Sequence, residues 1–239
     1  MKYLERTYRN KVSDNSLISF HVSVRETDLF IRSDKDFSDA ALQSVYKYRG
    51  FIESYIKFHP DFLTSLNPIA DDNLAPHIVR DMLNTSGAAG VGPMASVAGA
   101  ISEYVGVDLL DFSHNVIVEN GGDIFLKTEN DVTVAIFAGD SPLSYNLRLC
   151  LKSEQMPMGV CTSSGTVGHS LSFGKADAVC ILSKSSTMAD AAATAIGNLV
   201  KNKSDIKWAL ERGIKIEGVR GIVIIVGEHF GAVGEVELV

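Results

Sequence analysis

The first third of the chain shows two kinds of hydrophobic pattern. Apolar and polar residues alternate over 17–24 and 29–32, which predicts two strands joined by a turn. From 38 to 58 the apolar residues recur every three or four positions, and this spacing predicts a long helix. A short helix is expected at 60–66, because His59-Pro60 interrupts the helical pattern.

Two further helical patterns surround a stretch rich in glycine. Helices are predicted over 75–83 and 94–105, with residues 84–93 forming a loop between them. Pro93 suits the first turn of the second helix, because its missing N–H has no partner there in any helix. That helix carries small residues on one side, so we expect another backbone to approach it closely.

The second half of the chain consists mainly of predicted strands, with helices inserted in blocks. A helix rich in alanine is expected near 186–198 and another at 204–212, the latter ended by Gly213. Because strands mostly follow strands, the order predicts an α+β fold with antiparallel sheet and packed helices. The predicted strands are 115–119, 123–127, 132–138, 147–152, 158–162, 176–182, 221–226 and 233–239.

Composition narrows the class of protein. The chain has 239 residues, of which 46% are apolar and 21% charged, values typical of a globular protein. We therefore predict a single domain over residues 1–239. A net charge of −7 without a basic stripe argues against nucleic-acid binding, and no apolar run is long enough to span a membrane. The charged N-terminus and three unpaired cysteines predict a cytoplasmic protein.

The first candidate site is the glycine-rich stretch Gly87–Pro93. Backbone N–H groups at the start of a helix can hold a phosphate, so Gly90 and Gly92 are candidate ligand-binding residues. The alternative is a plain turn, because such stretches often serve only to connect helices.

The second candidate site is Glu119-Asn120-Gly121-Gly122-Asp123. Asn-Gly is a strong signal for a hairpin turn between two strands. Two consecutive glycines would also let a ligand lie against bare backbone, with the neighbouring carboxylates as polar contacts. Both interpretations are open.

The third candidate site follows a predicted apolar strand and begins Cys161-Thr162-Ser163-Ser164-Gly165. This segment continues to His169 and is dense in hydroxyl groups, which suits a surface that faces a ligand. His169 is a candidate acid or base near neutral pH, and the alternative is that it only hydrogen-bonds backbone. Cys161 is either a reactive thiol or a buried one.

The fourth candidate site lies on the alanine-rich helix, at Asp190 and Thr194. One interpretation is a capping box, with Thr187 as the N-cap and Asp190 reaching back to its N–H. The other is a metal site, because residues four apart share a helix face and could offer two oxygens to Mg²⁺. Thr194 could instead bond back to the carbonyl of Asp190.

The order of these segments resembles the ApbE superfamily, in a shorter branch. That superfamily consists of flavin transferases, which move FMN from FAD onto a protein threonine. Its pattern is a loop before a helix, a GGD turn, a TSG followed by histidine, and an ADAxxTA helix. Here the pattern corresponds to Gly90–Ala98, Gly121–Asp123, Thr162–His169 and Ala189–Ala195, about half the chain. The Lys that precedes the glycine in that pattern is absent.

The resemblance implies a T-fold-like α+β architecture, Mg²⁺ and FAD as cofactors, and specific roles for residues. Asp190, Thr194 and the carbonyl of Ala89 are the implied metal ligands, and His169 is the implied catalytic residue. The implied cofactor-binding residues are Gly90, Gly92, Asn120, Gly121, Gly122, Asp123, Thr162, Ser163, Ser164 and Gly165.

Three functions are therefore considered. The first is Mg²⁺-dependent transfer from FAD, and the second is a flavin or nucleotide binding or assembly factor without catalysis. The third is an accessory protein of cofactor or sulfur metabolism that acts on another small anionic substrate. The expected partner is a small ligand with phosphate or pyrophosphate, or another small anion for the third function. The first function adds an acceptor protein, and a homo-oligomer is left open.

Overall fold

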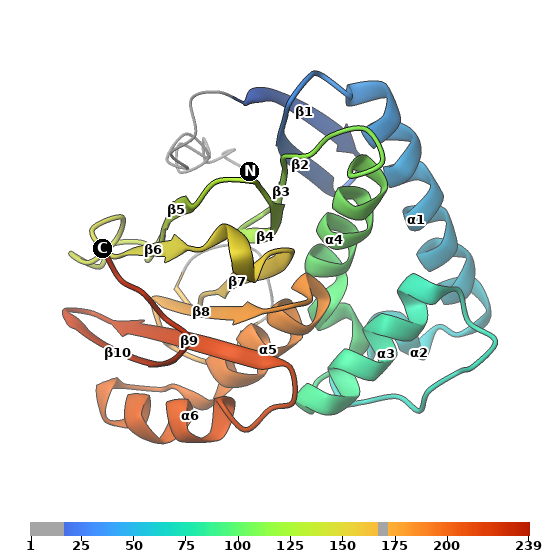
Figure 1. Ribbon diagram of the computed structural model, residues 1–239. Coiled ribbons are helices and arrows are strands. Elements are labelled where there is room, and N and C mark those ends of the chain that lie inside the picture. Colours follow the sequence, from blue (N-terminus) through green and yellow to red (C-terminus); the bar gives the residue numbers. More distant parts are fainter. Residues whose placement is uncertain (1–16, 167–171) are drawn as a thin grey trace.

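The computed structural model describes residues 17–166 and 172–239, and an antiparallel sheet dominates that part of the chain. Within it, eight strands lie in the order in which they occur along the chain, from β1 and β2 at the top of Figure 1 to β9 and β10 at the bottom. These strands are β1 Ile18–Val24, β2 Thr27–Ser33, β3 Val116–Asn120, β4 Asp123–Lys127, β7 Met158–Ser163, β8 Ala178–Ser183, β9 Val219–Val226 and β10 His229–Gly234. A separate hairpin is formed by β5 Val132–Ala135 and β6 Arg148–Leu151.

The helices enter the fold as two insertions between neighbouring strands. The first lies between β2 and β3 and consists of α1 Ser38–Phe58, α2 Asp61–Thr64, α3 His77–Ala89 and α4 Val97–Leu109. The second lies between β8 and β9 and consists of α5 Ser186–Leu199 and α6 Ile206–Gly213. The two insertions meet on one face of the sheet, where α4 packs on β3 and β4, and α5 packs on β7 and β8.

Alternating side chains separate two layers of core on the two faces of the sheet. On β3, Val116 and Val118 pack with the helices of the first insertion, whereas Ile117 packs toward the β5–β6 hairpin. The period of two follows from the pleat of a strand. Along β4 and β7, every second residue therefore directs its side chain toward α4 and α5, and the residues between them face the other way.

The predicted α+β class with antiparallel sheet and packed helices is confirmed. Several boundaries differ from the prediction. Gly213 lies in the last turn of α6, whose C-cap is Ile214, and β5 ends at Ala135 rather than at 138. Residues Gly87–Ala89 form the last turn of α3 rather than a loop, and the left-handed Gly90 (φ 77°) ends that helix. The last strand, β10, begins before the predicted 233–239 and ends at Gly234, and the end of the chain pairs with β6 through Leu149 and Leu238.

Two smaller predictions concern membranes and cysteines. Among the described residues, no helix is both long and apolar enough to cross a membrane. Cys161 and Cys180 are buried, Cys150 is half-buried, and all three are free thiols. The prediction of unpaired cysteines is confirmed.

Candidate functional site

Helices α4 and α5 cross at very close range near their N-termini. A Cβ atom at Gly99 would lie 2.2 Å from the carbonyl oxygen of Ser186 and 2.7 Å from Cβ of Asp190. Real Cβ atoms are not found at such distances from other heavy atoms, so only glycine fits at this position of α4. The small residues predicted on this helix thus have a structural reason, and they bring Asp190 onto the first turn of α4.

The two helices exchange carboxylate caps at this crossing. Asp190 of α5 accepts a hydrogen bond from the backbone N–H of Gly99 (2.9 Å), at the start of α4. In return, Glu103 of α4 accepts from the N–H of Thr187 (2.9 Å) and its hydroxyl (2.8 Å), at the start of α5. A carboxylate at a helix N-terminus satisfies N–H groups that have no partner within the helix and interacts favourably with the helix dipole.

The predicted capping box at Thr187 and Asp190 is wrong. The N-cap of α5 is Ser185, whose hydroxyl oxygen accepts from the N–H of Met188 (3.2 Å). Ser185 also donates to Glu103 (2.8 Å). Asp190 therefore caps a different helix from its own, and a partner that is remote in the sequence replaces the local one.

Asp190 lies beside a second carboxyl group, that of Asp123 on β4. Phe125 of the same strand contacts α4 at Gly106, so Asp123, two residues earlier, faces the helices as well. Burial and the neighbouring Asp190 raise the pKa of Asp123 well above its usual 3.8. Burial also raises the pKa of Asp190 to about 7, although the N–H groups of Gly99 and Ala98 oppose this. Two acidic groups thus share a region that stabilises neither charge.

Cys161 completes this buried group from the adjacent strand β7. Its thiol donates to the carbonyl of Ser186 (3.3 Å) and also interacts with Asp123. Burial and then the charges of Asp123 and Asp190 raise the pKa of the Cys161 thiol. Because the thiolate is the reactive form, this position favours the buried interpretation of Cys161 over the reactive one.

The predicted hairpin at the GGD motif is confirmed. Asn120 pairs with Asp123, and the two glycines between them both have positive φ, 69° for Gly121 and 111° for Gly122. Gly122 donates its N–H to Glu119 (2.7 Å), so this amide is already occupied. Asn120 donates its side-chain amide to the carbonyl of Ala98 (3.1 Å), which ties the turn to the first turn of α4.

Thr194 lies one turn beyond Asp190 on α5 and is half-buried. Among the described residues its hydroxyl has no hydrogen-bond partner, so the predicted bond back to the carbonyl of Asp190 is not present. By contrast, Thr85 and Ser102 make such backward bonds in α3 and α4. A hydroxyl at this spacing, on the same side of the helix as Asp190, is available to a ligand.

The TSSG segment divides between the two faces of the sheet. Ser163 lies close to Gly197 of α5, on the side of the helices. The hydroxyl of Thr162 interacts instead with Cys180 on the opposite face, and only its backbone N–H reaches Asp123. Ser164 contacts the neighbouring Thr166 (3.3 Å), and Gly165 donates its N–H to Ala176 (2.9 Å).

The first glycine-rich stretch has mainly structural roles. Gly90 is the C-cap of α3, and Ala89 is half-buried in the last turn of that helix. A Cβ atom at Gly92 would collide with the backbone of Ser65, so Gly92 permits close packing against the segment after α2. Neither contact assigns a ligand to these residues, and their predicted binding roles stay predictions. His169 lies outside the described residues.

The structure adds three residues of α4 to the contacts of the predicted site. It joins Asp123, Asn120, Asp190 and the first turn of α4, which carries Ala98 and Gly99. The sequence did not point to Glu103, and it predicted Ala98 and Gly99 only as small residues that allow another backbone to approach. The small residues of α4 were the only available signal, because they indicated a close approach without naming the partner.

The groups at the crossing are the type of ligand that Mg²⁺ prefers. Two carboxylates and one hydroxyl are hard oxygen donors, and Mg²⁺ usually takes few protein ligands together with waters or phosphates. The described residues contain no set of three or more His, Cys, Asp or Glu side chains placed to hold a metal. A cation at this crossing would therefore rely on mixed donors, and Asp190 and Thr194 fit such a set.

Comparison with known proteins gives one family and a consistent group of relatives. The family model described as "AbpE bacteria" matches residues 9–237. A UPF0280 protein of Methanococcus aeolicus is 42% identical over 226 residues, which cover 92% of this chain and 91% of the relative. A UPF0280 protein of Methanocaldococcus jannaschii is 43% identical over 221 residues, covering 90% of each chain.

Two solved structures have a similar fold. The apo form of the flavinyl transferase ApbE of Pseudomonas stutzeri has a TM-score of 0.57 at 13% identity, over 91% of this chain and 94% of that one. The ApbE protein of Thermotoga maritima has a TM-score of 0.55 at 12% identity, over 90% and 96% of the two chains. At such low identity the likeness establishes the fold.

Proposed function

This chain belongs to the family described as "AbpE bacteria", and on that premise we propose that it binds FAD with Mg²⁺ and transfers FMN to a hydroxyl group of an acceptor protein. The resemblance predicted from the sequence is confirmed for the family and for the fold. The cofactors, the site residues and the transfer reaction are the substance of the proposal.

The observation that carries the proposal is the pair of carboxyl groups at the α4–α5 crossing. Asp123 and Asp190 raise the free energy of the folded protein when both are charged, as their raised pKa values indicate. A divalent cation bound there would reverse this effect by neutralising both groups. Thr194, with no hydrogen-bond partner among the described residues, supplies a further oxygen one turn along α5.

Each residue then has a specific task. Asp190 and Thr194 would hold Mg²⁺, and the N–H of Gly99 would fix the carboxylate of Asp190 in position. Mg²⁺ supplies neutralisation of the charge on the diphosphate. The acceptor oxygen would form a bond to the phosphorus of the FMN half while the bond to AMP breaks. His169 is proposed to take the proton of the incoming hydroxyl.

A direct assay tests the reaction. The protein is incubated with FAD, Mg²⁺ and a panel of threonine-containing peptides, and AMP release and flavin-labelled peptide are measured. We expect both products in equal amounts. Thr194→Val should reduce AMP release by about tenfold or more, whereas Thr133→Val, at a half-buried position on β5, should leave it unchanged.

One observation favours a second candidate function, binding without catalysis. The position of the family's Lys in the first motif is taken by Val91, which is buried and cannot contribute a cation. If FAD binds with Mg²⁺ but releases no AMP with any peptide, the protein is a flavin-binding factor. If FAD does not bind at all, both versions of the proposal are wrong.

A further inference from the structure

Residues 172–175 form a short extended segment that is fixed to the C-terminal end of α5. The N–H of Phe173 donates to the side chain of Asn198 (2.9 Å), and the ammonium of Lys201 donates to the carbonyl of Phe173. The N–H of Lys175 donates to the carbonyl of Val200 (2.8 Å). At Gly174 the backbones are so close that a Cβ atom would overlap the carbonyl of Gly197. The backbone of Phe173 is thus held from both sides.

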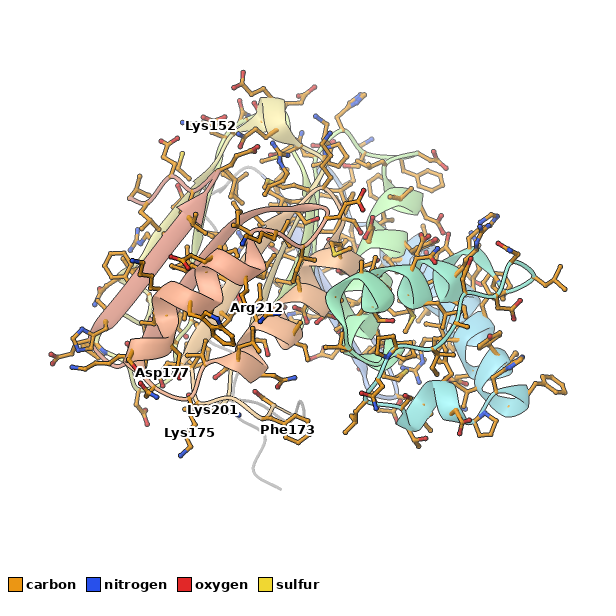
Figure 2. All side chains as sticks on the ribbon, turned by 90° about the horizontal axis from the view of Figure 1, so that it is seen from below. Lys152, Phe173, Lys175, Asp177, Lys201 and Arg212 are labelled. Atoms are coloured by element: carbon orange, nitrogen blue, oxygen red, sulfur yellow. The ribbon has the colours of Figure 1, made fainter. Side chains whose placement is uncertain are left out.

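The ring of Phe173, in contrast, is held by very little. The side chain is 54% exposed and has no aromatic partner among the described residues. Some exposed rings are paired, as Phe112 is with Phe37 and Trp208 is with the guanidinium of Arg212, whereas Phe230, like Phe173, has no aromatic partner among the described residues. Figure 2 shows Phe173, Lys175 and Lys201 together at one edge of the molecule. A rigid backbone that presents an unpaired ring beside cations is suited to bind a planar aromatic ring system.

Phe173 lies at the C-terminal end of α5, the helix that also carries Asp190 and Thr194. Asp190, Thr194 and Asn198 follow one another at intervals of four residues, so they lie along one side of the helix. Because a helix rises 1.5 Å per residue, Asn198 lies about 12 Å beyond Asp190. Asn198 holds the backbone of Phe173. A ligand whose diphosphate lies at Asp190 and Thr194, and which extends along this side of the helix, would arrive at the segment that carries Phe173.

We propose that Phe173 packs against the isoalloxazine ring of FAD, and that this contact makes the site prefer FAD to nucleotides without a flavin. The inference rests on the proposed function, because it takes the diphosphate position from it. The ribityl chain of FAD separates the ring system from the diphosphate, and such an extended linker suits the two helical turns between Asp190 and Asn198. The ammonium of Lys201, beside the carbonyl of Phe173, places positive charge near the flavin.

Two ligands and two variants test the proposal. The affinities for FAD and for ADP, each with Mg²⁺, are measured by calorimetry for the wild type, Phe173→Ala and Phe230→Ala. Phe230 is the matched control, because it is also exposed (47%) but lies on β10. We expect Phe173→Ala to weaken FAD binding by about tenfold and to change ADP binding less than about twofold. Phe230→Ala should change neither affinity.

A second measurement places the flavin ring directly. Tryptophan quenches the fluorescence of a flavin that it contacts, so Phe173→Trp should reduce the emission of bound FAD relative to the wild type, and Phe230→Trp should not. The proposal is overturned if Phe173→Ala weakens FAD and ADP equally, which would indicate adenine contact, or weakens neither. A wild-type protein that binds neither nucleotide instead contradicts the proposed function, and the two failures are therefore distinct.

Discussion

The carboxylate of Asp34 and the pair formed by Asp123 and Asp190 each connect segments that are remote in the sequence, and their surroundings are opposite. Asp34, after β2, accepts hydrogen bonds from the hydroxyl of Ser113 (2.8 Å), the N–H of His114 (2.8 Å) and the side-chain amide of Asn115 (2.8 Å). Burial alone would raise its pKa, but these donors outweigh it and lower the pKa below 3.8. At Asp123 and Asp190 burial prevails, and the pKa values rise.

The difference separates a carboxylate that the fold stabilises in its charged form from a pair that it does not. Asp34 is surrounded by donors, so its charge contributes to stability without any ligand. Asp123 and Asp190 have fewer donors and lie close to each other, so the folded protein without a cation disfavours their charged forms. Groups with such pKa shifts are candidates for functional sites, because a bound cation can stabilise the charged forms that the fold itself does not stabilise.

The largest effect is expected from removing the charge of Asp190. Asp190→Asn keeps an acceptor for the N–H of Gly99 but should weaken binding of Mn²⁺, measured by electron paramagnetic resonance, by roughly 100-fold or more. Asp34→Asn should leave Mn²⁺ binding unchanged. Equal effects of the two variants, or no Mn²⁺ binding by the wild type, would contradict the distinction between the two groups.

The next effect concerns the free energy of unfolding, for which Asp34 should matter more than Asp123. Asp34→Ala removes several charge-assisted hydrogen bonds and should lower the free energy of unfolding by about 2 kcal/mol. Asp123→Asn removes a disfavoured charge, so without divalent cations at pH 8 the free energy of unfolding should not fall. Urea denaturation measures both. Asp111→Ala, at an exposed position after α4, is the control and should change it by less than about 0.5 kcal/mol.

The pH dependence of stability should distinguish the same groups. The pKa of Asp190 is about 7 in the folded protein, above its usual value of 3.8, so the folded state holds this proton more tightly. Its contribution is complete below about pH 4 and is lost as the pH rises through 7. Without divalent cations we expect the free energy of unfolding to fall by about 1 kcal/mol or more between pH 5 and pH 8.

Two controls apply to this pH profile. Asp190→Asn should reduce the decrease and leave the part that Asp123 contributes, and saturating Mg²⁺ should reduce it in the wild type by favouring the charged forms. The lowered pKa of Asp34 acts only below about pH 4, outside this range. A wild-type profile that is flat or rises between pH 5 and pH 8 would contradict the raised pKa of Asp190.

The smallest effect is expected at Glu103, a carboxylate intermediate between the two groups. It accepts from Ser185 and twice from Thr187, so its role is to cap α5. Glu103→Gln keeps an acceptor oxygen but loses the charge, and should lower the free energy of unfolding by about 1 kcal/mol in thermal denaturation. Glu211→Gln, at an exposed position on α6, is the matched control. If Glu103→Gln lowered the free energy of unfolding as much as Asp34→Ala does, the proposed order of these effects would be wrong.

Local patterns were sufficient to predict most of the sheet and the longest helix. The helix predicted over 38–58 is α1, and the strand predicted over 123–127 is β4. The Asn-Gly signal correctly placed the turn at Gly121 and Gly122, because a tight hairpin depends on residues that can adopt positive φ. Such features depend on residues close together in the chain.

The candidate site was harder to predict because its contacts are remote in the sequence. Thr187 and Asp190 match a capping box. In the structure, however, Thr187 donates its N–H to Glu103, and Asp190 accepts from the N–H of Gly99. Gly87 was expected in a loop, whereas α3 continues through it and ends at Gly90. Thr162 was grouped with the other TSSG residues, yet the pleat directs its hydroxyl to the opposite face. Spacing alone did not reveal these tertiary partners.

The crossing of α4 and α5 also has a consequence for biosynthesis. Gly99 and Asp190 are 91 positions apart, and each belongs to a different insertion in the sheet. At roughly 5–20 residues per second, a ribosome needs about 5–20 seconds to proceed from one to the other. Throughout that interval the first turn of α4 lacks its carboxylate, and the growing chain has only half of the proposed cation site. The nascent chain could then bind the cation at this site only after α5 had been synthesised.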